Sequence, residues 1–145
     1  MRMRALLDTK VLLALFDSGH TFHPRATQWW SANKGEGWAS CPLTENGYLR
    51  IISQSGYPRP VRLADAALHL RTWAVPPLHE FWPDDVSILD AEMIDYTRLL
   101  SPKKITDVFL LALAVKHGGR LVSLDTGITV KAVKGARAEQ LVVMG

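Results

Sequence analysis

Four acidic side chains occupy positions from which they could act together in catalysis. They are Asp8, Glu45, Asp107 and Asp125. Carboxylates can transfer protons, and their oxygens are the ligands that Mg²⁺ and Mn²⁺ prefer in proteins. Asp8 follows the apolar run 5–7, and Asp125 follows the apolar run 121–124. An acid directly after a short apolar run predicts a carboxylate at the end of a buried strand.

The other two acids each follow a threonine. The sequence contains Thr44-Glu45 and Thr106-Asp107, each just before a segment with helical spacing. We predict that each threonine is the N-cap of a helix, which places its acid in the first turn. There the helix dipole and the free N–H groups favour an ionised carboxylate. Taken singly, each of the four acids is also an ordinary turn or cap residue, so the matched arrangement carries the argument.

Short apolar runs alternate with longer segments of helical spacing along the whole chain. Strands are predicted at 4–7, 38–41, 79–82, 121–124 and 140–144, and helices at 11–16, 23–34, 44–53, 61–73, 91–100 and 106–117. Asp90 would cap the helix 91–100, and the pair Gly118-Gly119 would end the last helix. Strands that alternate with helices predict βαβ units. The expected fold is therefore an α/β protein, a three-layer α/β/α sandwich with a mainly parallel central sheet.

This fold would bring the acids together at one edge of the sheet. Ligands of parallel sheets bind outside the carboxyl ends of the strands, where the following helices begin. Four ionised carboxylates at that edge would repel one another, and a divalent cation would neutralise them. Oxygen ligands alone favour Mg²⁺ or Mn²⁺, which can activate water and stabilise the leaving oxygen of a phosphodiester. The predicted ligands are Asp8, Glu45, Asp107 and Asp125, the last either as a ligand or as the residue that holds a metal-bound water.

Length and composition exclude several other classes of protein. With 145 residues, of which 48% are hydrophobic, the sequence predicts one globular domain over residues 1–145. The single cysteine, Cys41, excludes an intramolecular disulfide and a cysteine zinc cluster. No apolar run approaches the roughly 18 residues of a membrane span, and the first eight residues lack the apolar stretch of a secretory signal. We therefore expect a cytoplasmic protein without a membrane partner.

Charge is unevenly distributed along the chain. The net charge is only +3, but residues 98–137 carry eight lysines and arginines and only two acids, Asp107 and Asp125. Such a basic field can attract a polyanion, although it is also compatible with an ordinary solvated face.

Five segments resemble those of the PIN-domain ribonucleases, and specifically the toxins of VapBC-type toxin–antitoxin pairs. They are 6–17, 38–50, 79–85, 105–114 and 119–125. The resemblance spans the chain in the right order. It implies a metal-dependent endoribonuclease that is the toxin of a type II toxin–antitoxin system. It further implies an RNA substrate, a Mg²⁺ or Mn²⁺ cofactor, a cognate VapB-type antitoxin and a homodimer, with Asp8, Glu45, Asp107 and Asp125 as the acidic quartet.

Lys10 departs from the family's pattern. A small polar residue, often asparagine, usually stands two positions after the first aspartate. The ammonium could weaken a metal site, contact a substrate phosphate or extend into solvent. The alternative function is accordingly a catalytically weakened PIN-like module that only binds RNA or a protein. A phosphatase with Asp8 as its nucleophile is disfavoured, because Lys10 replaces the second aspartate that such enzymes use.

The resemblance also suggests how a protein inhibitor would bind. An arginine of the antitoxin would pair with Asp8, Glu45 or Asp107 in place of the metal. Its apolar anchors would occupy a groove between the second and fourth helices. The groove residues would be Trp29, Trp30, Leu70 and Trp73, and the cations beside the acids would be Lys10, Arg50 and Lys131 or Lys134.

Overall fold

In the computed structural model, which describes residues 3–99 and 101–145, the strands form one sheet in the order β3-β2-β1-β4-β5. The strands are β1 (Ala5–Leu7), β2 (Trp38–Ser40), β3 (His79–Phe81), β4 (Arg120–Ser123) and β5 (Leu141–Val143). Each neighbouring pair is parallel. Because β1 lies between β2 and β4, the residue that follows it lies at the middle of the carboxyl edge.

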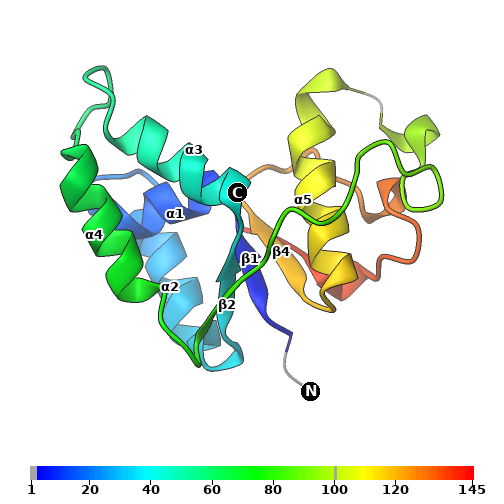
Figure 1. The fold of residues 1–145 in the computed structure, drawn as a ribbon, viewed down its shortest axis with the longest axis horizontal. Helices are drawn as coiled ribbons and strands as arrows, with labels where there is room; N and C mark the ends of the chain where they lie inside the picture. Colours follow the sequence, from blue (N-terminus) through cyan, green and yellow to red (C-terminus); the bar gives the residue numbers. More distant parts are fainter. Residues whose placement is uncertain (1–2, 100) are drawn as a thin grey trace.

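Helices cover both faces of this sheet. They are α1 (Thr9–Phe16), α2 (His23–Asn33), α3 (Pro42–Ile52), α4 (Leu63–Trp73) and α5 (Ile105–Lys116). Figure 1 shows α1 to α4 on one side of the strands and α5 on the other. Gly118, with a φ of +68°, follows the end of α5 as the sequence predicted. Within the described residues, no helix is long and apolar enough to cross a lipid bilayer.

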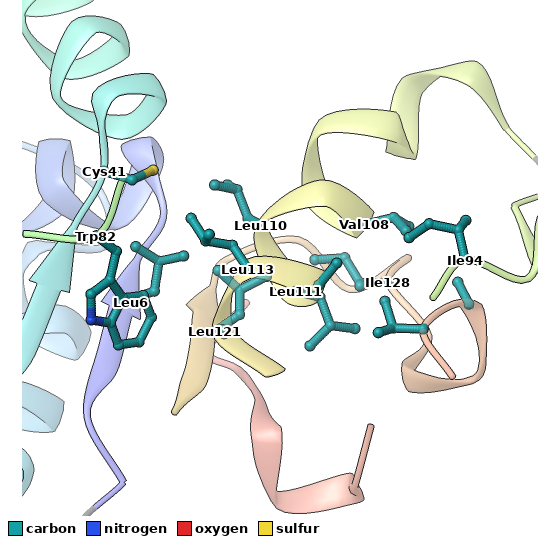
Figure 2. Packing of buried hydrophobic residues seen from close by; sticks show 14 of the residues in the cluster. Leu6, Cys41, Trp82, Ile94, Val108, Leu110, Leu111, Leu113, Leu121 and Ile128 are labelled. Carbon is teal, nitrogen blue, oxygen red and sulfur yellow. The ribbon is translucent and has the colours of Figure 1, made fainter. Parts of the chain in front are cut away.

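Alternation along the central strands produces two hydrophobic cores. In β1, Leu6 packs into the core beneath α5, whereas Ala5 and Leu7 pack into the core beneath the other helices. In β4, Leu121 and Val122 divide in the same way. Figure 2 shows the side chains of α5 gathered over the sheet around Leu121. The predicted three-layer α/β/α sandwich is confirmed, and its sheet is parallel throughout the described residues.

The predicted helix at 91–100 is wrong. Residues up to Leu99 form turns and a short 3₁₀ helix, Tyr96–Arg98, while Leu100 lies outside the described residues. Ile94 is buried and forms an isolated antiparallel bridge with Val133. Backbone hydrogen bonds to the segment 132–134 therefore replace those of a helix. Asp90 caps only a single turn, in which its carboxylate accepts from the backbone N–H of Glu92.

The predicted N-caps are also wrong, although the acids lie where they were expected. The helix α3 begins at Pro42 after Cys41, since proline suits the first helical position, and Thr44 lies inside the first turn. The helix α5 begins at Ile105, so Thr106 is its second residue. A 3₁₀ helix, Pro102–Lys104, leads into α5. Glu45 and Asp107 still stand in the first turns of their helices.

A buried carboxylate ties the end of α1 to the loop before α4. Asp17 accepts hydrogen bonds from Tyr57 Oη at 2.5 Å and from Arg59 Nε and Nη2 at 2.7 and 2.8 Å. Its side chain is 5% exposed. The Arg59 guanidinium holds the pKa of the Asp17 carboxyl well below its usual range. These hydrogen bonds tie the loop 56–60 to the end of α1.

Asp17→Asn is expected to lower the free energy of unfolding by about 2 kcal/mol at pH 7, because the charge-assisted bonds are lost. The folded-state pKa of Asp17 is depressed, so its contribution is complete above the unfolded pKa of about 3.9. It is lost as the pH falls toward the folded pKa. Urea unfolding of both proteins from pH 7 to pH 3 measures this dependence. A gap between them that stays constant below pH 4 would contradict it.

Candidate active site

A cavity of about 350 Å³ opens at the carboxyl edge of the sheet, between the starts of α1, α3 and α5. It brings together three of the four predicted acids, from segments far apart in the sequence. The lining residues are Asp8, Thr9, Lys10, Leu43, Gly47, Arg50, Ile51, Lys103, Thr106, Asp107 and Asp125. The parallel sheet explains this convergence, because its strand ends and helix starts meet at one edge.

Asp8 is the most buried acid of the cavity, with 8% of the residue exposed. It is the N-cap of α1, and its carboxylate accepts a hydrogen bond from Thr9 N at 2.7 Å and from Ser123 Oγ at 3.3 Å. Burial raises the pKa of Asp8, and these two hydrogen bonds partly oppose the shift. Asp8 is thus held rigidly at the end of the central strand.

The pKa values of Asp107 and Asp125 are shifted in opposite directions. Burial, together with the nearby carboxylates of Asp8 and Asp125, raises the pKa of Asp107 to about 6. Hydrogen bonds from Lys104 and Gly127 N lower the pKa of Asp125 to about 2. Lys104 Nζ lies 2.6 and 2.7 Å from the two oxygens of that carboxylate. Asp125 therefore has a neutralising partner in Lys104, whereas Asp107 has none at bonding distance in the described structure.

Glu45 is not among the lining residues of this cavity in the described chain. Its Oε2 accepts a hydrogen bond from Ser40 Oγ at 2.6 Å, and Ser40 Oγ lies 2.8 Å from His79 Nε2. Since a carboxylate only accepts, the chain of bonds runs from His79 through Ser40 to Glu45. Burial and the nearby Arg4 charge lower the pKa of His79 to about 4, so the imidazole is neutral at pH 7.

Three exposed cations line the cavity beside the acids. Lys10, Arg50 and Lys103 are exposed and line the cavity. Lys10 and Arg50 were predicted there from the sequence. Lys131 and Lys134 are not among the lining residues, and Lys134 Nζ donates to the carbonyl of Ala91 instead. The turn before α5 supplies the third cation, because it places Lys103 beside the first turn of that helix.

Besides Lys103, two residues of the site escaped sequence analysis. Ser123 was assigned no role, yet it donates to Asp8 and its Oγ accepts from the backbone N–H of Asp125 at 3.0 Å. Lys104 was counted only as part of the basic field. Its place next to Asp107 and directly before a helix was a usable signal, because the start of α5 lies at the same edge as the strand ends.

The donor set fits a hard cation that retains water. Within residues 3–99 and 101–145, no three side chains of His, Cys, Asp or Glu stand close enough to enclose a metal by themselves. Mg²⁺ commonly binds through one or two carboxylates and keeps several waters. Asp8 and Asp107 provide such oxygens without a lysine partner in the described structure. The mutual repulsion that contributes to the raised pKa of Asp107 is what a cation would relieve.

Comparison with known proteins identifies the family. The model of the PIN domain matches residues 5–134, which include Asp8, Asp107 and Asp125. The chain belongs to the PIN-domain family. This PIN domain is 49% identical to ribonuclease VapC44 of Mycobacterium tuberculosis over 142 residues. The match covers 98% of this chain and 100% of the relative. The resemblance to VapC-type PIN ribonucleases is thereby confirmed.

Two further relatives from the same organism agree. Ribonuclease VapC39 is 37% identical to this PIN domain over 135 residues, which is 92% of this chain and 96% of the relative. Ribonuclease VapC38 is 38% identical over 125 residues, which is 86% of each chain.

Proposed function

We propose that this protein is a metal-dependent endoribonuclease that acts as the toxin of a type II toxin–antitoxin system. The observation that carries the proposal is the cavity in which three carboxylates meet three exposed cations. Acids alone would repel RNA, and cations alone would only bind it. Their combination suits a site that attracts a phosphodiester and cleaves it. The extended similarity to VapC ribonucleases supports the same activity.

Asp8 and Asp107 would hold Mg²⁺ or Mn²⁺. Bound there, the ion would supply activation of water and neutralisation of charge on the phosphodiester. Lys10, Arg50 and Lys103 would bind the phosphates of the RNA on either side of the cleaved bond. Asp125 would accept a hydrogen bond from the attacking water and so orient it.

Several sequence predictions remain untested. The role of Glu45 as a fourth ligand stays a prediction; one of its carboxylate oxygens accepts a hydrogen bond from Ser40. The single domain over 1–145, the cytoplasmic location and the homodimer also stay predictions. The single domain is supported by one sheet that draws strands from both ends of the chain.

Lys10 decides between the enzyme and the binding module, because its ammonium lines the cavity and its charge acts on Asp8. We expect the wild type to cleave RNA with Mg²⁺ or Mn²⁺. Lys10→Asn should bind Mn²⁺ about threefold more tightly, since it removes one exposed positive charge worth under about 1 kcal/mol. Gel-based cleavage and Mn²⁺ titration measure both. Cleavage by Lys10→Asn alone, with an inert wild type, would favour the binding module instead.

A cognate VapB-type antitoxin would block the cavity and lie along the neighbouring aromatic surface. Trp73 is 38% exposed, and its ring lies 5.5 Å from that of Trp30. Leu70, predicted as a groove residue, is buried and belongs to the core. The proposed groove is therefore formed by Trp30, Trp73 and the exposed residues of α4, whereas the ring of Trp29 lies 5.4 Å from the Arg120 guanidinium.

Excess Mg²⁺ is expected to weaken inhibition by the antitoxin, because the metal and an arginine of the inhibitor would compete for the same carboxylates. The inhibitor concentration that halves RNA cleavage, measured across a range of Mg²⁺ concentrations, tests this competition. Trp73→Ala should weaken inhibition as well, without changing cleavage by the free protein. Inhibition that is indifferent to both the metal and this substitution would refute the proposed mode of binding.

A further inference from the structure

Lys104 makes a close ion pair at the border of the cavity. Its Nζ lies 2.6 Å from Asp125 Oδ1 and 2.7 Å from Oδ2, and both side chains are about three-quarters buried. The preceding residue, Lys103, lines the cavity and has no such acidic partner in the described structure. The two consecutive lysines therefore differ in their contacts: Lys103 faces the cavity, and Lys104 forms an ion pair with Asp125.

The loop after β4 is built to admit this lysine. A Cβ at Gly127 would lie 2.6 Å from both Nζ and Cε of Lys104, closer than side-chain carbons approach other atoms. The backbone N–H of Gly127 also donates to Asp125 Oδ1 at 2.9 Å. Gly127 thus leaves the space through which the ammonium reaches the carboxylate.

Both oxygens of Asp125 are consequently engaged by a cation inside the protein. Oδ1 accepts from Lys104 and from Gly127, and Oδ2 accepts from Lys104. Asp8 differs, because its donors Thr9 and Ser123 are neutral. A metal that approached Asp125 would have to displace a positive charge already held at bonding distance.

We propose that Lys104 is a positioning residue that keeps Asp125 from binding the metal directly. The inference rests on the proposed function, in which Asp8 and Asp107 hold the ion. By pairing with Asp125, Lys104 fixes that carboxylate beside the ion and leaves its remaining lone pairs for water. Without Lys104, Asp125 would coordinate the metal directly, so the metal would bind more tightly. Cleavage would slow, because Asp125 would no longer orient the attacking water.

The opposite signs of these two effects make the proposal testable. Mn²⁺ affinity is measured by isothermal titration calorimetry on the full chain without RNA, and cleavage is measured at saturating Mn²⁺. Lys104→Gln should bind Mn²⁺ about tenfold more tightly and show a reduced kcat with little change in KM. Gly127→Ala displaces only the flexible end of the Lys104 side chain, so its effects should have the same signs and be smaller. Gly127→Ala retains every charge, so it separates displacement of the lysine from a simple change in net charge.

Two matched variants serve as controls. Lys104→Arg keeps a cation next to Asp125 and should retain the wild-type Mn²⁺ affinity. Lys131→Gln removes a lysine that does not line the cavity and should also leave that affinity unchanged. Circular dichroism and thermal melts check that each variant is folded. If one of the two test variants is unfolded, the other still decides the question.

Unchanged or weaker Mn²⁺ binding by the folded variants would overturn the role of Lys104. If the wild type itself bound no Mn²⁺ and cleaved no RNA, the proposed function would fail and the inference with it. A wild type that does both, beside variants that match it, would overturn the inference alone.

Discussion

Asp8→Asn is expected to lose at least about a hundredfold of the Mg²⁺-dependent RNA cleavage. Even groups that only support metal ligands cost about 10–100-fold when they are removed, and Asp8 is proposed as a ligand itself. The substitution replaces one carboxylate oxygen by an NH₂ group and so removes the negative charge at the end of β1. Asparagine is also a good N-cap, so the bond from Thr9 N can be retained and the fold should survive.

Asp65→Asn is the matched control, since Asp65 lies exposed in the first turn of α4 and does not line the cavity. It should cleave RNA at the wild-type rate. Mn²⁺ titration of both variants distinguishes loss of the ion from loss of chemistry. Cleavage that survives Asp8→Asn would show that the activity comes from another site or from a contaminant.

Leu111→Ala should cost about 3 kcal/mol of unfolding free energy, because it leaves a void in a fully buried layer. Leu111 is 0% exposed and belongs to the core that α5 shares with the sheet and with Ile128 (Figure 2). For a domain of this size the loss corresponds to a fall in Tm of roughly 6–12 °C. Because α5 carries Asp107, RNA cleavage should also be lost at a lower temperature.

Leu89→Ala removes the same atoms from a residue that is 82% exposed, and it should change the Tm very little. Differential scanning calorimetry of the two variants provides the comparison. Equal melting temperatures for Leu111→Ala and the wild type would mean that α5 does not pack on the sheet as described.

Three of the four acids could be located from the sequence because local signals and the topology agreed. Asp8 and Asp125 follow apolar runs, and Asp107 stands in the first turn of an apolar helix. In a parallel sheet these positions meet at one edge whatever the details of packing. The prediction therefore needed only the order of strands and helices along the chain. The alternation of short apolar runs with segments of helical spacing indicated that order.

Glu45 satisfied the same rule but is bonded elsewhere. On α3, Leu43, Gly47, Arg50 and Ile51 line the cavity, whereas Glu45 does not. Ser40, the last residue of β2, donates a hydrogen bond to the Glu45 carboxylate. The placement thus depended on a tertiary partner that local spacing does not indicate.

The segment 91–99 was mistaken for a related reason. Its apolar spacing is compatible with a helix, yet Ile94 is used to bridge Val133, almost forty residues later. The gain from burying one side chain and pairing two backbones exceeded the weak local preference. Helical spacing in a short segment cannot report such a distant contact.

The central position of β1 has a consequence for the order in which the protein is made. β1 carries Asp8, but its neighbour β4 and the acid that follows it are synthesised more than a hundred residues later. Parallel pairing of this kind depends on non-local contacts and forms late. A nascent chain that has completed only α1 to α4 holds one acid of the cavity and lacks the other two. The three acids are therefore not brought together until α5 and β4 have been synthesised and folded, so the candidate active site cannot form before then.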